Sequence, residues 1–158
     1  MTGLDDKAKQ YSLKLLSYKG RSEKELEERL KKKGITGHVI SSTIIYLKNI
    51  GLVNDMSLAE TLKREALTHK MLSYFGARNF MLRRGIPKSI IDSVLSRDDN
   101  ADIENAIKLV DRKLRILGTY PADTAKRRLY NLLVRRGYSS GTIMKVLKEK
   151  MMREEDET

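Results

Sequence analysis

The chain has 158 residues, no cysteine and a formal net charge of +11, and hydrophobic residues make up 40% of it. The lack of cysteine excludes disulfide bonds and thiolate metal sites, and the length indicates one domain or a short array of small modules. The excess of positive charge is spread along the whole chain. Residues 1–54 contain 11 basic and 6 acidic residues, residues 55–98 contain 8 basic and 5 acidic, and residues 99–158 contain 13 basic and 10 acidic. Such a distribution favours a polyanionic partner or a partner with an acidic face.

The segment 1–54 is predicted to form three helices. Apolar residues at helical spacing indicate the first of them over about 5–18. Ser22 and Glu25 form an S-x-x-E capping box, in which each side chain accepts the other residue's backbone N–H, so a second helix begins there. This helix ends on three lysines before Gly34, and a third helix carries Ile40, Ile44 and Leu47 in line.

The segment 55–98 repeats this organisation. Asp55 is placed to cap a helix whose apolar residues are Leu58, Ala59, Leu62 and Ala66. A shorter helix is predicted from Gly76 to Arg84, and a third opens at Pro87, a residue that suits the first helical position.

The segment 99–152 is predicted to hold the last three helices. A long first helix runs through Ile103 and Leu117, and two more lie around Leu129 and Val146. Residues 153–158 are expected to be an acidic, frayed tail.

Three glycines divide the chain evenly. Gly34, Gly85 and Gly137 lie at intervals of 51 and 52 residues, which is typical of a structural repeat. No segment alternates with the period of a β-strand. We therefore predict an all-α fold of three tandem three-helix repeats, 1–54, 55–98 and 99–152.

The sequence offers no convergent reactive groups. His38 and His69 lie in different repeats without metal-ligand spacing, and no Gly-rich phosphate loop is present. We expect no catalysis, no cofactor and no metal site. The first residues lack the apolar stretch of a signal peptide, and no apolar run approaches membrane-spanning length, so a cytoplasmic protein without a membrane partner is expected. We also expect a monomer.

The basic residues before each glycine have two interpretations. Cations in the last helical turn stabilise the negative end of the helix dipole, and glycine supplies the left-handed cap, which explains any single copy. Arginine pairs at equivalent places could also bind phosphate or carboxylate groups along an extended partner. Under this second interpretation the candidate contacts are Arg83, Arg84, Arg127, Arg128, Arg135 and Arg136, with Lys31, Lys32 and Lys33 as a further set.

Three stretches point to a known family: KGRSEKELEERLKKKGI (19–35), GLVNDMSLAE (51–60) and RRLYNLLVRRGYSSGTI (127–143). They resemble segments of the RecX family, the regulatory proteins of the recombinase RecA. The similarity covers about residues 8–147. Leu58 replaces the usual Phe of the family, Asn54 replaces the first residue of an Asp pair, and Gly76 lies closer than usual to the middle glycine.

The resemblance implies both an architecture and a function. RecX proteins are elongated, curved arrays of three three-helix repeats. They bind RecA filaments on single-stranded DNA and restrain filament extension, ATPase, strand exchange and coprotease activity. The alternative is a stand-alone nucleic-acid-binding protein that uses its second and third helices as helix-turn-helix pairs.

Overall fold

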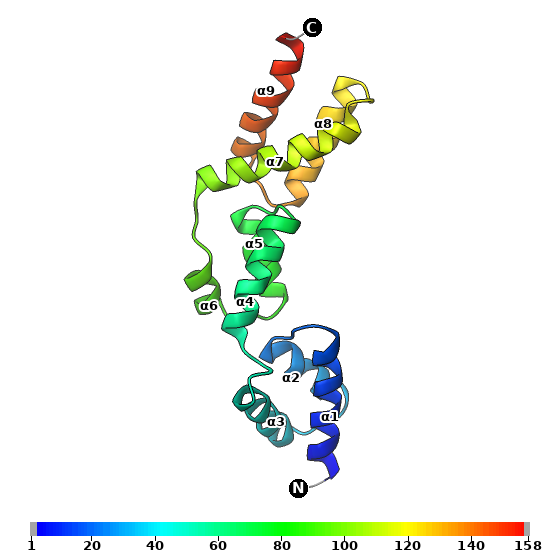
Figure 1. Cartoon of the computed structure of the whole chain (residues 1–158), viewed down its shortest axis with the longest axis vertical. Coiled ribbons are helices and arrows are strands. Elements are labelled where there is room, and N and C mark those ends of the chain that lie inside the picture. The colour runs from blue at the N-terminus through cyan, green and yellow to red at the C-terminus, as the bar shows by residue number, and fades with distance from the viewer. Residues whose placement is uncertain (1–2, 157–158) are drawn as a thin grey trace. The chain divides into compact units, whose positions relative to one another are not determined.

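The computed structural model of the chain describes the backbone of residues 3–156 and the side chains of these residues except 4 and 152–156. This part of the chain is helical throughout and contains no strand (Figure 1). The helices are α1 (Gly3–Tyr18), α2 (Glu23–Lys32), α3 (Gly37–Asn49), α4 (Asp55–Arg64), α5 (Tyr74–Arg83), α6 (Lys88–Val94), α7 (Asp99–Leu117), α8 (Ala122–Arg135) and α9 (Ser140–Asp156). The predicted all-α fold is confirmed.

The chain divides into two compact units, which we describe separately. One contains the residues up to Leu62 together with Met81–Val94, and the other contains Lys63–Phe80 together with the residues from Leu95 onward. The chain passes between the units at three places, inside α4, inside α5 and directly after α6, so the predicted middle repeat contributes residues to each unit.

In the first unit α1, α2 and α3 pack on one another. α2 begins at the predicted capping box: Ser22 Oγ accepts from the Glu25 N–H at 3.1 Å, and Glu25 Oε1 accepts from the Ser22 N–H at 3.0 Å. Leu26 and Leu30, one helical turn apart, are fully buried. Burial of each such side chain stabilises the fold by about 1.5–3 kcal/mol, so these two residues fix the inward face of α2.

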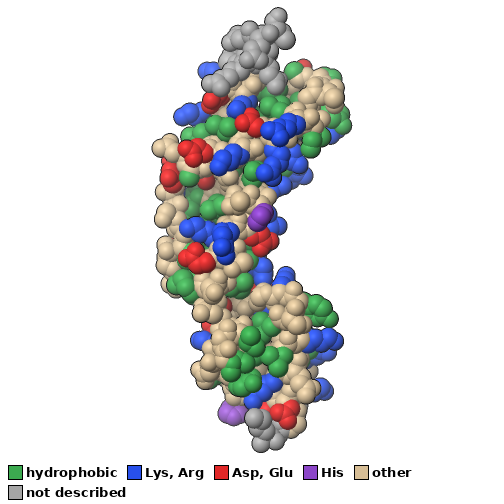
Figure 2. Space-filling view, in the orientation of Figure 1, with side chains coloured by type: hydrophobic (Ala, Val, Ile, Leu, Met, Phe, Trp, Pro, Cys, Tyr) green, Lys and Arg blue, Asp and Glu red, His purple; other side chains and the backbone are tan. Residues whose placement is uncertain are grey.

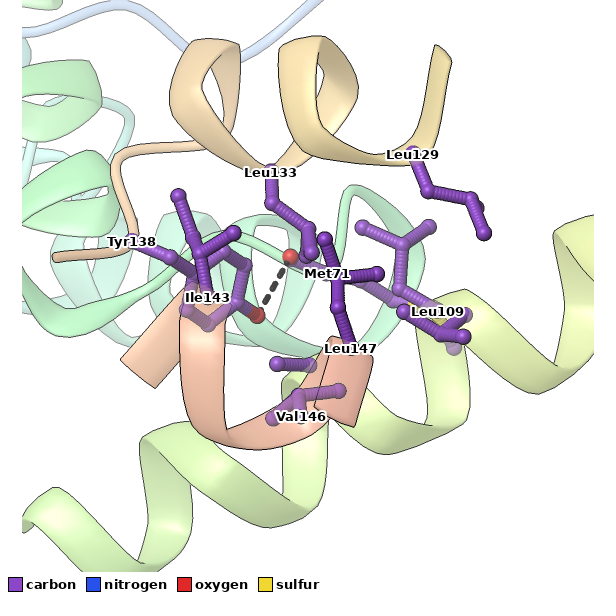
Figure 3. Close-up of a cluster of buried hydrophobic side chains, with 10 residues drawn as sticks. Met71, Leu109, Leu129, Leu133, Tyr138, Ile143, Val146 and Leu147 are labelled. Atoms are coloured by element: carbon purple, nitrogen blue, oxygen red, sulfur yellow. Dashed lines mark hydrogen bonds between the residues drawn. The ribbon is translucent and has the colours of Figure 1, made fainter. Parts of the chain in front are cut away.

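In the second unit α7, α8 and α9 pack on one another around a buried cluster (Figure 3). Leu133 of α8 and Val146 and Leu147 of α9 meet within it. Tyr138, in the turn between these helices, donates its hydroxyl hydrogen to the Met71 carbonyl at 2.8 Å. Burial raises the pKa of the Tyr138 hydroxyl above its ordinary value of 10.0, so this donor stays protonated well beyond neutral pH.

Several local features differ from the sequence-based expectations. α4 continues directly into a one-turn π-helix, Glu65–His69, after which Met71 adopts a positive φ of 51°. Pro87 directly precedes the first residue of α6 rather than occupying it. α9 keeps a helical backbone to Asp156 and so includes part of the expected tail 153–158, of which residues 157–158 lie outside the described part.

Candidate partner-binding surface

The helices α2, α5 and α8 end in the same way. Their glycines, Gly34, Gly85 and Gly137, have φ angles of 81°, 81° and 90°. In each case the glycine N–H donates to the carbonyl three residues earlier, and the next residue donates to the carbonyl five residues earlier. Glycine is favoured here because a side chain strains the left-handed conformation. The helix-end interpretation of the motif therefore holds at all three places.

Two of these glycines also lie against the start of another helix. A Cβ added to Gly85 would lie 2.6 Å from Ser22 Oγ, and one added to Gly137 would lie 2.8 Å from Ser73 Oγ and 2.8 Å from the Gly76 nitrogen. Ser22 caps α2, and Ser73 corresponds to it before α5, because its Oγ accepts from the Gly76 N–H at 3.0 Å. We call these contacts the first glycine junction (the end of α5 on the start of α2) and the second glycine junction (the end of α8 on the start of α5).

An aspartate from a following helix joins each junction. Asp55 of α4 accepts from the N–H of Glu23, the first residue of α2, at 3.1 Å. Asp102 of α7 accepts from the N–H of Tyr74, the first residue of α5, at 2.9 Å. Burial raises the pKa of both carboxyl groups above their ordinary value of 3.8. The expectation that Asp55 caps its own helix is wrong: Asn54 does so, accepting from the Ser57 N–H at 3.1 Å.

In the two Arg-Arg pairs that directly precede a glycine, the second arginine has a partner at the junction. Arg84 Nε lies 3.1 Å from Glu25 Oε2, and Arg84 Nη2 donates to the Gly20 carbonyl at 2.9 Å. Arg136 is half-buried and donates to the Lys70 carbonyl. Because their hydrogen-bonding groups meet partners within the chain, Arg84 and Arg136 are suited to holding the junctions rather than to binding an external anion.

The two junctions differ at the third residue of the docked helix, which is glutamate in α2 and glycine in α5. The third residue of α2 is Glu25, whose carboxylate accepts from both the Ser22 N–H and Arg84. The third residue of α5 is Gly76, so the Ser73 N–H donates instead to the Arg136 carbonyl at 3.1 Å. A Cβ on Gly76 would collide with that carbonyl oxygen, so this position has no room for a side chain.

We predict that Arg84→Met lowers the free energy of unfolding by about 1–3 kcal/mol, because it removes charge-assisted hydrogen bonds from side chains that are only 17% (Arg84) and 20% (Glu25) exposed. Arg83→Met, at the exposed neighbouring position, should change it by no more than about 0.5 kcal/mol. Urea denaturation of the two variants checks the difference, and equal unfolding midpoints would contradict the role given to Arg84.

The remaining candidate cations are exposed. They are Lys31, Lys32 and Lys33 at the end of α2, Arg83 at the end of α5, and Arg127, Arg128 and Arg135 on α8. The Lys33 Nζ lies 4.9 Å from the centre of the Tyr11 ring, and the Arg128 guanidinium lies 4.6 Å from that of Tyr120. Basic side chains are present on both units in Figure 2. The structure thus separates the candidate set into exposed cations and junction arginines.

Sequence reasoning missed Ser73, Gly76 and Asp102 as junction residues. The repeat period contained a signal for one of them, since Ser73 lies 51 residues after Ser22, whereas Asp102 lies 47 residues after Asp55 and so departs from the period. No periodicity identifies Gly76, because its counterpart in α2 is Glu25.

A pocket of about 600 Å³ in the second unit is lined by residues including Lys63, Asp102, Asn105 and Arg112. Asn105 Nδ2 donates to the carbonyls of Leu67 and Leu72, so both Asn105 and Asp102 support the backbone around the second glycine junction. Among the described residues no cluster of His, Asp and Glu is arranged to hold a metal ion. No helix within residues 3–156 is long and apolar enough to cross a membrane.

Two family profiles match the ends of the chain. The profile of the first three-helix domain of RecX matches residues 8–47, within α1–α3, and that of the third three-helix domain matches residues 100–147, within α7–α9. These profiles place one three-helix RecX domain match near each end of the chain.

Relatives and solved structures cover most of the chain. The regulatory protein RecX of Amycolatopsis mediterranei is 31% identical over 146 residues, which span 92% of this chain and 83% of the relative. That of Mycobacterium avium is also 31% identical, over 90% of this chain and 84% of its own length. The crystal structure of RecX from Lactobacillus salivarius has the same fold, with a TM-score of 0.72 at 22% identity over 94% of this chain and 97% of that one. On its identity to these relatives over most of both lengths, the chain belongs to the RecX family of regulatory proteins.

Proposed function

We propose that this protein is a non-enzymatic regulator that binds RecA filaments on single-stranded DNA. By binding, it restrains filament extension and thereby ATPase, strand exchange and coprotease activity. Membership of the RecX family carries this proposal, and the net charge of +11 supports it, since both the DNA and an acidic protein face attract a basic chain.

The exposed cations are the proposed contacts. Arg127, Arg128 and Arg135 lie on one helix, α8, and can pair with phosphate or carboxylate groups through planar guanidinium groups. The corresponding set in the first unit is Arg83 with Lys31, Lys32 and Lys33 at the end of α2. Arg84 and Arg136 act indirectly in this proposal, by fixing the helix ends that carry their exposed neighbours.

The test is a titration of the DNA-dependent ATPase of RecA with this protein, with the binding of single-stranded DNA by this protein alone measured in parallel. We expect the ATPase of RecA to be almost completely inhibited when the concentration of this protein approaches that of RecA. Full ATPase activity at a molar excess would overturn the proposal. Salt-sensitive, sequence-selective DNA binding without inhibition would instead establish the stand-alone nucleic-acid-binding alternative.

A further inference from the structure

Gly34 is the one of the three glycine ends that has no neighbour in the described structure. Its φ of 81° equals that of Gly85, and the hydrogen bonds around it follow the same pattern. A Cβ added to Gly34 would meet no atom within 4 Å, whereas one on Gly85 or Gly137 would meet the start of another helix. Within the described residues of the first unit, the end of α2 therefore has the backbone shape of the other two glycine ends but no helix start packed against it.

The two glycine junctions show what fits such a surface. In both, the glycine lies against a serine that caps the first turn of a helix, Ser22 or Ser73. The residue before the glycine, Arg84 or Arg136, donates to the docked segment, and Arg84 does so partly to a carboxylate in the first turn of α2. The common occupant is thus the N-terminus of a helix with a hydroxyl cap and an acceptor group nearby.

Charge complementarity favours the same kind of occupant at Gly34. The end of a helix carries the negative pole of its dipole and the start of another carries the positive pole, so the two attract when they meet. Lys33 precedes Gly34 as Arg84 precedes Gly85, and Lys31 and Lys32 are exposed beside it. These cations favour an acidic first turn in the docked helix.

The described helix starts of a second copy do not combine a free hydroxyl cap with an acidic first turn. Ser22 and Ser73 are already covered by Gly85 and Gly137. Pro121, which precedes α8, makes no side-chain hydrogen bond to the first turn. Ser139 caps α9 by accepting from the Thr142 N–H at 3.2 Å, but the first turn of α9 has no acidic residue. These features favour a helix of another protein as the occupant.

We propose that the end of α2, residues 31–35, docks the N-terminus of a helix of the recombinase, with a Ser or Thr cap and an acidic first turn. This inference rests on the proposed function for the identity of the partner. It adds a contact in which backbone shape, set by Gly34, matters as much as the positive charge of the lysines.

The test compares Gly34→Ala with Gly51→Ala. Gly51 ends α3 with a φ of 79° and also has no atom within 4 Å of an added Cβ, so the two substitutions impose the same strain on the same unit. Binding of each full-length variant to RecA filaments on single-stranded DNA is measured by interferometry, after circular dichroism has matched their helix content. We expect Gly34→Ala to weaken binding at least tenfold and Gly51→Ala to leave it unchanged.

The outcomes separate the two proposals. Equal binding by the wild type and both variants would overturn the docking surface and leave the proposed function in place. No binding by the wild type would overturn the proposed function, and the docking inference with it. A dimer of the wild type in light scattering that Gly34→Ala converts to a monomer would show that a second copy is the occupant, against the inference.

Discussion

Gly137→Ala is expected to lower the free energy of unfolding by about 2–5 kcal/mol. About 1–2 kcal/mol of this is the cost of placing a side chain at a φ of 90°. The remainder, about 1–3 kcal/mol, comes from overpacking, since the new methyl group would lie 2.8 Å from the Gly76 nitrogen and 2.9 Å from the Gly76 Cα. Backbone cannot move aside as a flexible side chain can, so the second glycine junction must open.

Gly34→Ala is the matched control for this prediction. It has nearly the same φ but nothing within 4 Å of the added Cβ, so only the conformational cost of about 1–2 kcal/mol applies. Chemical denaturation of the two variants, compared at equal protein concentration, measures the difference. If both lose the same stability, Gly137 is merely a helix cap and the junction carries no packing constraint.

The sequence was informative where one local rule decides the structure. The capping box of Ser22 and Glu25 was predicted and is confirmed by both of its hydrogen bonds, because capping depends on residues three apart in the chain. The glycine ends were equally accessible, since a basic last turn followed by glycine has few other conformations available.

The junctions were not predictable in the same way, because they depend on contacts between residues far apart in sequence. Asp55 looked like the cap of its own helix, yet its carboxylate accepts from Glu23, 32 residues earlier. The sequence alone does not distinguish Arg83 from Arg84. Only the packing of the end of α5 on the start of α2 directs Arg84 toward Glu25 and leaves Arg83 exposed. The candidate set, chosen on positive charge alone, therefore combined the junction arginines with the exposed cations that can contact a partner.

That distinction determines which charge reversal tests the proposed function. The triple variant Arg127→Glu, Arg128→Glu, Arg135→Glu changes only exposed residues of α8 and leaves Arg136 in its junction. Each exposed ion pair contributes on the order of 0.2–1 kcal/mol. Reversal also adds repulsion, so a combined loss of about 1–4 kcal/mol is expected. Such a loss raises the protein concentration needed for half-maximal inhibition of the RecA ATPase by about fivefold to several hundredfold.

A second triple variant, Lys7→Glu, Lys14→Glu, Lys19→Glu, makes the same change in net charge at exposed positions of α1 and the loop that follows it. It should retain most of the inhibition if the location of the charge on α8 matters, and both variants should keep the wild-type circular dichroism spectrum. Equal losses in the two variants would mean that the protein acts through its overall charge. Undiminished inhibition by the α8 variant would remove this helix from the binding surface and leave the end of α2 and Arg83 as the remaining candidates.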